Sequence, residues 1–309
     1  MFMFSGQGSQ YYQMGRGLFE HDLVFRSWLL ELDAIARRLL ESSVLDAMYD
    51  PSRRKGEPFD RITLTHPAIF MVEFALAQAL IARGVRPDGV LGVSLGTLTA
   101  AAVAGCLGPE EALTAVVAQA RAIEAHCRPG GLIAILAEPE PLERDGLCGL
   151  CEIAASNGPA HFVVAAPASH LDRIEKFLRD RQVTFQRLPV PYAFHSRWIE
   201  EAKRPCQASS TTIPFRPPRM PLMCCANARM VTEMAGDYLW AVARGPIRFG
   251  DAIACLERDG GYRYVDVGPS ASLAAVLRHV LPAASASDVR SVLTPFGGDV
   301  RNLEAMTGA

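Results

Sequence analysis

Long helical patterns alternate with short apolar runs over the first 126 residues of the chain. The runs at residues 1–4 and 89–93 are predicted to be buried strands, because a strand inside a parallel sheet is apolar on both faces. Apolar positions recur at helical spacing over residues 11–45, with a break near Gly17 and His21, and again over 67–82 and 109–126. This alternation predicts an α/β core with a mainly parallel sheet.

The long apolar helix before the second strand has recognisable boundary signals. Thr65 is predicted to cap it, Pro67 to open it and Gly84 to end it, since proline suits the first turn of a helix and glycine suits the position after its end. Residues 50–60, which contain two prolines and a glycine, are predicted to form a surface loop.

The pattern changes after residue 126. Residues 131–136 and 162–166 are predicted strands, 168–181 an amphipathic helix and 183–191 another extended segment. This order suggests a small ferredoxin-like insertion. We therefore predict two subdomains with these boundaries: a large one from residues 1–128 and 195–309, and a small one from 129–194.

The chain returns to the larger core after residue 195. Residues 264–267 are predicted to form a late strand, and 273–279 a closing helix. The segment after Ala283 has little pattern and is expected to be loosely held.

Composition narrows the class of protein. The 309 residues are half hydrophobic, enough for one large core and a smaller one. The net charge is −2, with acidic and basic residues interspersed, so we predict no nucleic acid partner and no anionic lipid surface. Because no apolar run reaches about eighteen uncharged residues and the start lacks a signal-peptide pattern, we expect no membrane segment and a cytoplasmic location.

Eight cysteines are scattered along the chain and are expected to be reduced in the cytoplasm. Cys148 and Cys151 have the CxxC spacing of a zinc or redox site, but no second pair at metal-ligand spacing accompanies them. We predict no metal and no redox cofactor.

Candidate chemistry begins at Gly92-Val93-Ser94-Leu95-Gly96, between the second predicted strand and a small-residue helix. In a Gly-x-Ser-x-Gly elbow the serine occupies a strained turn, and side chains at the flanking glycines would clash. The following helix would bring free amides near a developing negative charge. The alternative is an ordinary strand-turn-helix with an incidental serine.

A nucleophilic serine needs a base, and His195 is the candidate among the seven histidines. It lies where the chain is predicted to return to the large subdomain, at a cleft between the two. The alternative is a loop histidine with a structural role. His66 and His126 are interpreted as helix-terminus residues.

Four segments in chain order carry a family resemblance. They are Phe4-Ser5-Gly6-Gln7-Gly8-Ser9-Gln10, Gly92-Val93-Ser94-Leu95-Gly96, Tyr192-Ala193-Phe194-His195 and Gly245-Pro246-Ile247-Arg248-Phe249. Together the chain resembles the malonyl-CoA:acyl carrier protein transacylase family, which includes polyketide synthase acyltransferase domains. The resemblance implies an α/β-hydrolase-like large subdomain with an inserted ferredoxin-like small one, and a Ser94–His195 dyad. It also implies an oxyanion hole from the amides of Gln7 and Leu95, and a histidine oriented by a backbone carbonyl near Val242.

One departure from the family bears on the acyl group. Malonyl-using members carry an arginine on the helix after the elbow, and Gln119 stands at that position. Glutamine cannot form a bidentate ion pair with a free carboxylate. Arg121 lies about 200° further around the same helix and should face away. The alternative is that Gln119 faces solvent and another cation, such as Arg128, serves.

Further departures are Val93, where the family usually has histidine, and Thr97, where it often has glutamate. Val93 is taken with Gln119, Tyr192 and Phe194 as the acyl-selectivity set. With the opening motif of residues 5–15, these features make the chain similar to stand-alone acyl hydrolases of trans-acyltransferase polyketide systems.

That similarity implies removal of stalled acetyl and other neutral acyl groups from acyl carrier proteins. The phosphopantetheine arm, or CoA, would enter only as part of the substrate, and the family suggests a monomer. Two alternatives stay open. One is an acyltransferase that loads malonyl or another acyl unit onto a carrier protein, and the other is a non-catalytic subunit that docks carrier proteins.

Overall fold

The core of the molecule is a six-stranded sheet with the strand order β11-β10-β1-β2-β7-β8. The computed structural model describes residues 1–211, 213–234 and 237–307, except the side chains of residues 148 and 259. All neighbouring strands are parallel except the last pair, β7 and β8. The strands are β1 (Phe2–Phe4), β2 (Val90–Gly92), β7 (Leu222–Cys224), β8 (Arg229–Met230), β10 (Arg263–Asp266) and β11 (Asp288–Ser291).

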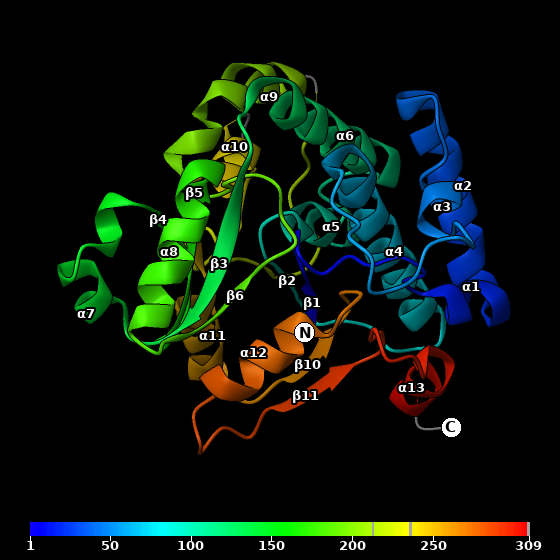
Figure 1. The fold of residues 1–309 in the computed structure, drawn as a ribbon. Coiled ribbons are helices and arrows are strands. Elements are labelled where there is room, and N and C mark those ends of the chain that lie inside the picture. Colours follow the sequence, from blue (N-terminus) through cyan, green and yellow to red (C-terminus); the bar gives the residue numbers. More distant parts are fainter. Residues whose placement is uncertain (212, 235–236, 308–309) are drawn as a thin grey trace.

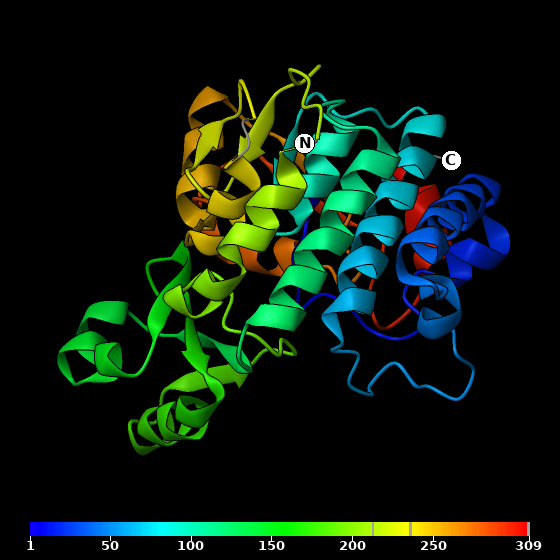
Figure 2. The same cartoon turned by 90° about the horizontal axis from the view of Figure 1, so that it is seen from above.

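The first half of the chain supplies the helices packed beside this sheet. They are α1 (Arg16–His21), α2 (Leu23–Leu40), α3 (Val44–Met48), α4 (Ile62–Ala82), α5 (Gly96–Val103) and α6 (Pro109–His126). In Figure 2, α2, α4 and α6 lie side by side. The predicted helical break near His21 is confirmed, because Asp22 caps α2 by accepting a hydrogen bond from the Phe25 amide at 2.7 Å.

The predicted start of α4 is wrong. The helix begins at Ile62, and Pro67 lies inside it. Proline removes one helical hydrogen bond, but the residues of the preceding turn, among them Thr65 and His66, are buried and hold that turn in place. Helix α4 is long and apolar enough to cross a membrane by length and composition. However, 83% of the apolar 18-residue stretch within α4 is buried inside the protein.

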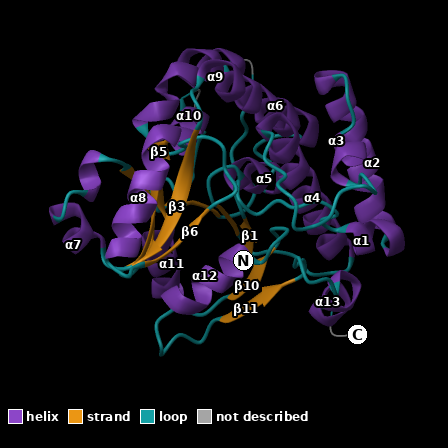
Figure 3. Cartoon of the chain, in the orientation of Figure 1, coloured by secondary structure: helices purple, strands orange, loops and turns teal. Residues whose placement is uncertain are grey.

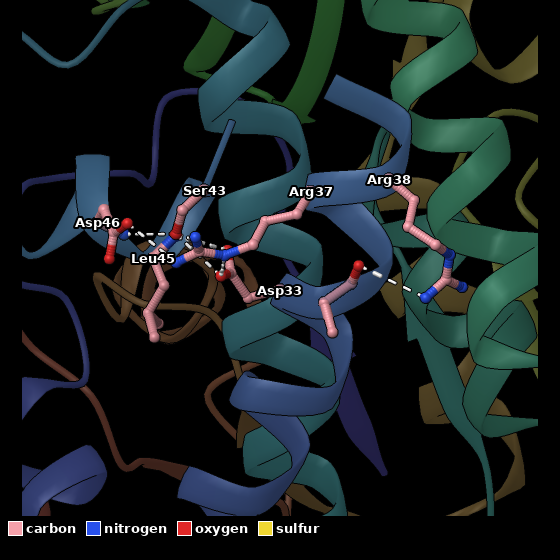
Figure 4. A network of polar contacts seen from close by, with 7 residues as sticks. Asp33, Arg37, Arg38, Ser43, Leu45 and Asp46 are labelled. Carbon is pink, nitrogen blue, oxygen red and sulfur yellow. Dashed lines mark hydrogen bonds and ion pairs between the residues drawn. The ribbon is translucent and has the colours of Figure 1, made fainter. Parts of the chain in front are cut away.

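A buried carboxylate ties α2 to α3 (Figure 4). Asp33 is 3% exposed and accepts hydrogen bonds from the Ser43 hydroxyl and the Leu45 amide. Arg37 pairs with the same carboxylate at 2.8 Å and also reaches Asp46. The Ser43 hydroxyl and the Leu45 amide, both at the start of α3, therefore have a partner on α2, which holds the two helices together.

A second sheet of five strands, in the order β6-β3-β5-β4-β9, lies to one side of the first (Figure 1, left). Its elements in chain order are β3 (Gly130–Leu136), α7 (Pro139–Arg144), β4 (Glu152–Gly158), β5 (His161–Pro167), α8 (Ala168–Asp180) and β6 (Thr184–Arg187). This β-α-β-β-α-β unit is ferredoxin-like. The predicted α/β architecture of two subdomains is confirmed, and the exact boundaries stay a prediction.

Two elements of this unit were absent from the sequence prediction. Strand β4 carries polar residues and pairs with β5 through register shifts, so it lacks a clean alternation of apolar and polar positions. Helix α7 has only six residues, two of them proline. Strand β9 (Ile247–Arg248) comes from a later part of the chain and pairs with β4, which joins the two subdomains.

The remaining helices are α9 (Lys203–Ser210), α10 (Tyr238–Arg244), α11 (Phe249–Leu256), α12 (Ser272–Val280) and α13 (Asp299–Met306). The predicted late strand and closing helix correspond to β10 and α12. The expectation of a loosely held tail is wrong, because β11 adds to the main sheet and Val292, Leu293 and Leu303 are buried. Figure 3 shows β11 beside β10 at the sheet edge and α13 beyond it.

Candidate active site

Ser94 lies on a sharp turn between β2 and α5. Its φ is +55°, a left-handed conformation that side chains rarely adopt. A Cβ at Gly92 would lie 2.4 Å from Cα of Thr97, and one at Gly96 would lie 2.2 Å from the Phe4 carbonyl oxygen. Only glycine fits at both flanking positions, which is the physical basis of the Gly-x-Ser-x-Gly pattern.

The structure brings Ser94 and His195 together although 101 residues separate them. The Ser94 Oγ and His195 Nε2 atoms are 2.8 Å apart. His195 is 3% exposed and also has a positive φ, +60°. A serine hydroxyl in contact with an imidazole nitrogen is the arrangement of a nucleophile and its general base.

A backbone carbonyl orients the histidine, as expected, but the predicted position of that carbonyl is wrong. The acceptor at 2.8 Å from His195 Nδ1 is the oxygen of Gly245, three residues after Val242. Val242 lies within α10, whereas Gly245 follows the helix with extended backbone, and this lets its carbonyl turn toward the imidazole. With its proton on Nδ1, the ring presents Nε2 as an acceptor to the Ser94 hydroxyl.

Burial keeps this histidine neutral. It lowers the pKa of His195 from 6.5 to about 4, and the nearby Arg244 acts in the same direction, while the hydrogen bond to Gly245 opposes the shift.

We therefore predict an acid-tolerant pH profile. A base with a lowered pKa keeps its proton-accepting form at lower pH, so kcat/KM of a reaction that uses His195 as its base should stay level from about pH 8 to about pH 5. Below that it should fall with a midpoint near pH 4. Initial rates across this range, with circular dichroism at each pH to confirm folding, provide the measurement. A midpoint near 6.5 would contradict a buried, neutral base.

The backbone amides of Gln7 and Leu95 lie on segments beside Ser94. Among the described residues, neither backbone N–H has a hydrogen-bond acceptor. Leu95 stands at the start of α5, and the loop carrying Gln7 runs close to Ser94, because a Cβ at Gly6 would lie 3.0 Å from that of Ser94. Both amides belong to segments that meet at the serine.

Glu73, which sequence reasoning missed, anchors this loop. Its carboxyl accepts hydrogen bonds from the Ser5 amide at 2.6 Å, the Ser5 hydroxyl at 2.8 Å and the Thr99 hydroxyl at 3.0 Å. Burial raises the pKa of Glu73 to about 8, against the effect of these hydrogen bonds. The available signal was that Glu73 is the only charged residue in the otherwise uncharged sequence of α4.

Ser94 lines two hollows. The larger, of about 340 Å³, lies between the two sheets, and residues of both subdomains line it, including His195, Leu132 and His161. The smaller, of about 20 Å³, is bounded by residues of α4, α5, α6 and α10. Ser94 therefore stands between an open cleft and a small internal cavity.

The residues of the predicted selectivity set occupy different places. Gln119 and Phe194 line the small cavity, and Phe194 also lines the large cleft. Val93 lines only the cleft. Tyr192 lines neither hollow and packs edge-on against Phe194, with 6.3 Å between ring centroids.

No cation among the described residues lines the small cavity. Arg121 is exposed and donates a hydrogen bond to the Leu39 carbonyl of α2, so it faces away from Gln119, and Arg128 is exposed and does not line the cavity. His66, which was interpreted as a helix-terminus residue, lines the cavity instead. Burial lowers its pKa to about 3, so it carries no charge near pH 7.

Cys148 belongs to the pair with CxxC spacing, and its side chain lies outside the described residues. The prediction that this pair holds no metal therefore stays a prediction. In the part of the chain that the structure describes, no three histidine, cysteine, aspartate or glutamate side chains form a metal-binding group.

Comparison with known proteins places this geometry in context. The family model described as acyl transferase domain matches residues 1–306. The polyketide biosynthesis acyltransferase homolog BaeD of Bacillus velezensis is 43% identical over 305 residues, covering 98% of this chain and 94% of that protein. The homolog PksD of Bacillus subtilis is 39% identical over 307 residues, covering 99% and 95%. A solved structure, a loading acyltransferase from the avermectin modular polyketide synthase, superimposes with a TM-score of 0.92 at 25% identity, covering 99% of this chain and 98% of that one.

Proposed function

This chain belongs to the acyl transferase domain family, and from that premise we propose that it hydrolyses acyl carrier protein thioesters in polyketide biosynthesis. It removes acetyl and other uncharged acyl groups through an acyl-Ser94 intermediate. The choice of acyl group rests on the small cavity beside Ser94. Gln119 and a neutral His66 line this cavity, and no cation among the described residues lines it.

The first half of the reaction acylates the serine. His195 Nε2 takes the proton of Ser94 Oγ as that oxygen attacks the thioester carbonyl carbon, and a tetrahedral intermediate forms. The Gln7 and Leu95 amides donate to its oxyanion, and each such donor stabilises the transition state by roughly 3 to 4 kcal/mol. The intermediate collapses by breaking the carbon–sulfur bond, and the imidazolium returns its proton to the departing thiol of the phosphopantetheine arm or CoA.

The second half releases the acid. A water molecule in the cleft attacks the ester carbon while His195 Nε2 accepts one of its protons. The oxyanion again faces the two amides. Collapse breaks the ester bond, His195 protonates Ser94 Oγ, and the carboxylic acid leaves. Hydrolysis rather than transfer is supported by the similarity to stand-alone proofreading hydrolases in the opening motif, the elbow and Gln119.

The lack of a cation among the described residues of the small cavity supports a preference for uncharged acyl groups. A malonyl carboxylate buried there without a cationic partner is destabilised by roughly 3 to 5 kcal/mol. Since 1.4 kcal/mol corresponds to a factor of ten, this disfavours malonyl by about two to three and a half orders of magnitude. An acetyl group has no such penalty.

The named relatives are polyketide biosynthesis proteins, so we propose that acyl carrier protein domains deliver the substrate. We further propose a cytoplasmic location, a monomeric state, and the predicted division into residues 1–128 with 195–309 and 129–194. The rival functions are loading of a carrier protein and non-catalytic docking.

One assay separates the three functions. The purified protein is incubated with acetyl- or malonyl-loaded carrier protein in the presence of a second, unloaded carrier, and both carriers are followed by intact mass. We expect loss of acetyl from the first carrier, no gain on the second and much slower loss of malonyl. Gain on the second carrier would establish transfer, and an unchanged first carrier would favour docking.

A further inference from the structure

The small cavity beside Ser94 contains buried polar atoms that the fold leaves without partners. His66 is 1% exposed, and neither of its ring nitrogens has a hydrogen-bond partner among the described residues. The same holds for the hydroxyl of Thr97, which is also 1% exposed. Both side chains line the cavity, together with Gln119 and Ser94.

Packing does not account for these two polar side chains. Buried polar groups are nearly always hydrogen-bonded, and those that are not destabilise the fold. The neighbouring Phe194 ring, 5.5 Å from the His66 ring between centroids, offers no acceptor in its plane. The cavity that both side chains line is therefore the place where an occupant could supply partners for His66 and Thr97.

The cavity has room for a small occupant. Its volume of about 20 Å³ corresponds to one or two groups the size of a water molecule. Water is expected there in the free protein, since polar side chains, among them His66, Thr97, Gln119 and Ser94, line the space. Since Ser94 forms part of the wall of this space, the end of a short acyl chain on Ser94 is within reach of it.

The chemistry of the lining selects the group that fits. A neutral imidazole presents one donor and one acceptor, and the Thr97 hydroxyl and Gln119 amide can each donate and accept. A hydroxyl group, which also does both, can pair with one ring nitrogen of His66 and with the Thr97 hydroxyl. A methyl group of the same size leaves them unpaired, and a carboxylate adds a charge that the cavity does not balance.

We propose that this cavity binds the hydroxyl group of a short hydroxyacyl chain, with His66 and Thr97 as the residues that recognise it. The proposal rests on the proposed function, because it assumes that Ser94 is acylated, and it names the acyl class that the site prefers. Short hydroxyacyl thioesters are the preferred substrates, and acetyl is accepted because water remains in the cavity beside it.

Matched thioester pairs test this recognition. Glycolyl is compared with propionyl, and 3-hydroxypropionyl with butyryl, since each pair differs only by a hydroxyl in place of a methyl. The probes are thioesters of N-acetylcysteamine, and the readout is kcat/KM for release of the thiol. Thiol release reports acylation of Ser94 whether water or another thiol later removes the acyl group.

The wild type should prefer the hydroxyl member of at least one pair by roughly tenfold or more. Thr97→Val, which keeps the shape of the side chain, and His66→Leu should each reduce that ratio toward one. His66→Gln, which retains a donor and an acceptor, should preserve it. His126→Leu, at the exposed end of α6, is the control that should change nothing.

Ratios near one for both pairs in the wild type, or ratios that survive both Thr97→Val and His66→Leu, would overturn the proposal. If the thiol is released with the expected ratios but the acyl group passes to an acceptor carrier, hydrolysis fails and hydroxyl recognition stands. Absence of thiol release from every probe would overturn both proposals.

Discussion

Replacing Ser94 by alanine is expected to lower kcat/KM for thioester cleavage by about 10⁴-fold or more and to abolish any covalent acyl adduct. The reason is that Ser94 Oγ is the atom that forms the new bond, and its contact with His195 Nε2 at 2.8 Å supplies the base. Intact mass after mixing with acetyl carrier protein should show an acetyl adduct on the wild type, and none on Ser94→Ala.

The two members of the dyad should act as a unit. His195→Gln is expected to cost nearly as much as Ser94→Ala, and the double variant little more than either one. His161 lines the same cleft, where its Nε2 pairs with the Asn157 side-chain amide at 3.3 Å, so His161→Gln is the matched control and should retain activity. An acyl adduct on Ser94→Ala, or additive losses in the double variant, would show that another nucleophile carries the reaction.

Replacing Gln119 by arginine is expected to raise malonyl acylation relative to acetyl acylation by about two orders of magnitude. Arginine would bring a fixed cation to the cavity that Gln119 now lines, and a guanidinium pairs with a carboxylate in a bidentate manner. Rates of adduct formation on Ser94 with malonyl and acetyl thioesters give the ratio.

Two controls separate charge from size in this experiment. Gln119→Leu removes the amide without adding charge and should leave malonyl disfavoured. Arg121→Gln should have no effect on the ratio, because Arg121 faces α2. Failure of Gln119→Arg to form any malonyl-serine adduct, with acetyl acylation intact, would show that position 119 does not control acyl selectivity.

Strands β1, β2 and β10 of the main sheet and the elbow could be predicted from local sequence, whereas β7, β8 and β11 were not. Fully buried parallel strands are continuous apolar runs, and the glycines beside Ser94 are required by contacts of 2.4 Å or less that a Cβ would make. Both signals lie within a few residues of the feature that they predict.

The features that were not predicted from the sequence depend on contacts between distant segments of the chain. Strand β4 is held by pairing with β5 and β9 rather than by its own apolar pattern, and β11 adds to the sheet edge through β10. Which carbonyl orients His195 depends on where α10 ends. The acceptor is that of Gly245, three residues after the predicted Val242. His66 was assigned to a helix end because Pro67 follows it, yet α4 begins four residues earlier and turns this side chain into the cavity.

The central claim is that water releases the acyl group from Ser94, and the most direct measurement is the fate of that group in isotopically labelled water. Acetyl carrier protein is mixed with the enzyme in H₂¹⁸O, with an equal amount of unloaded second carrier present. The account predicts free acetate carrying one ¹⁸O atom from solvent and no acetyl on the second carrier, with neither change in Ser94→Ala. Unlabelled acetyl on the second carrier, with no labelled acetate, would contradict it.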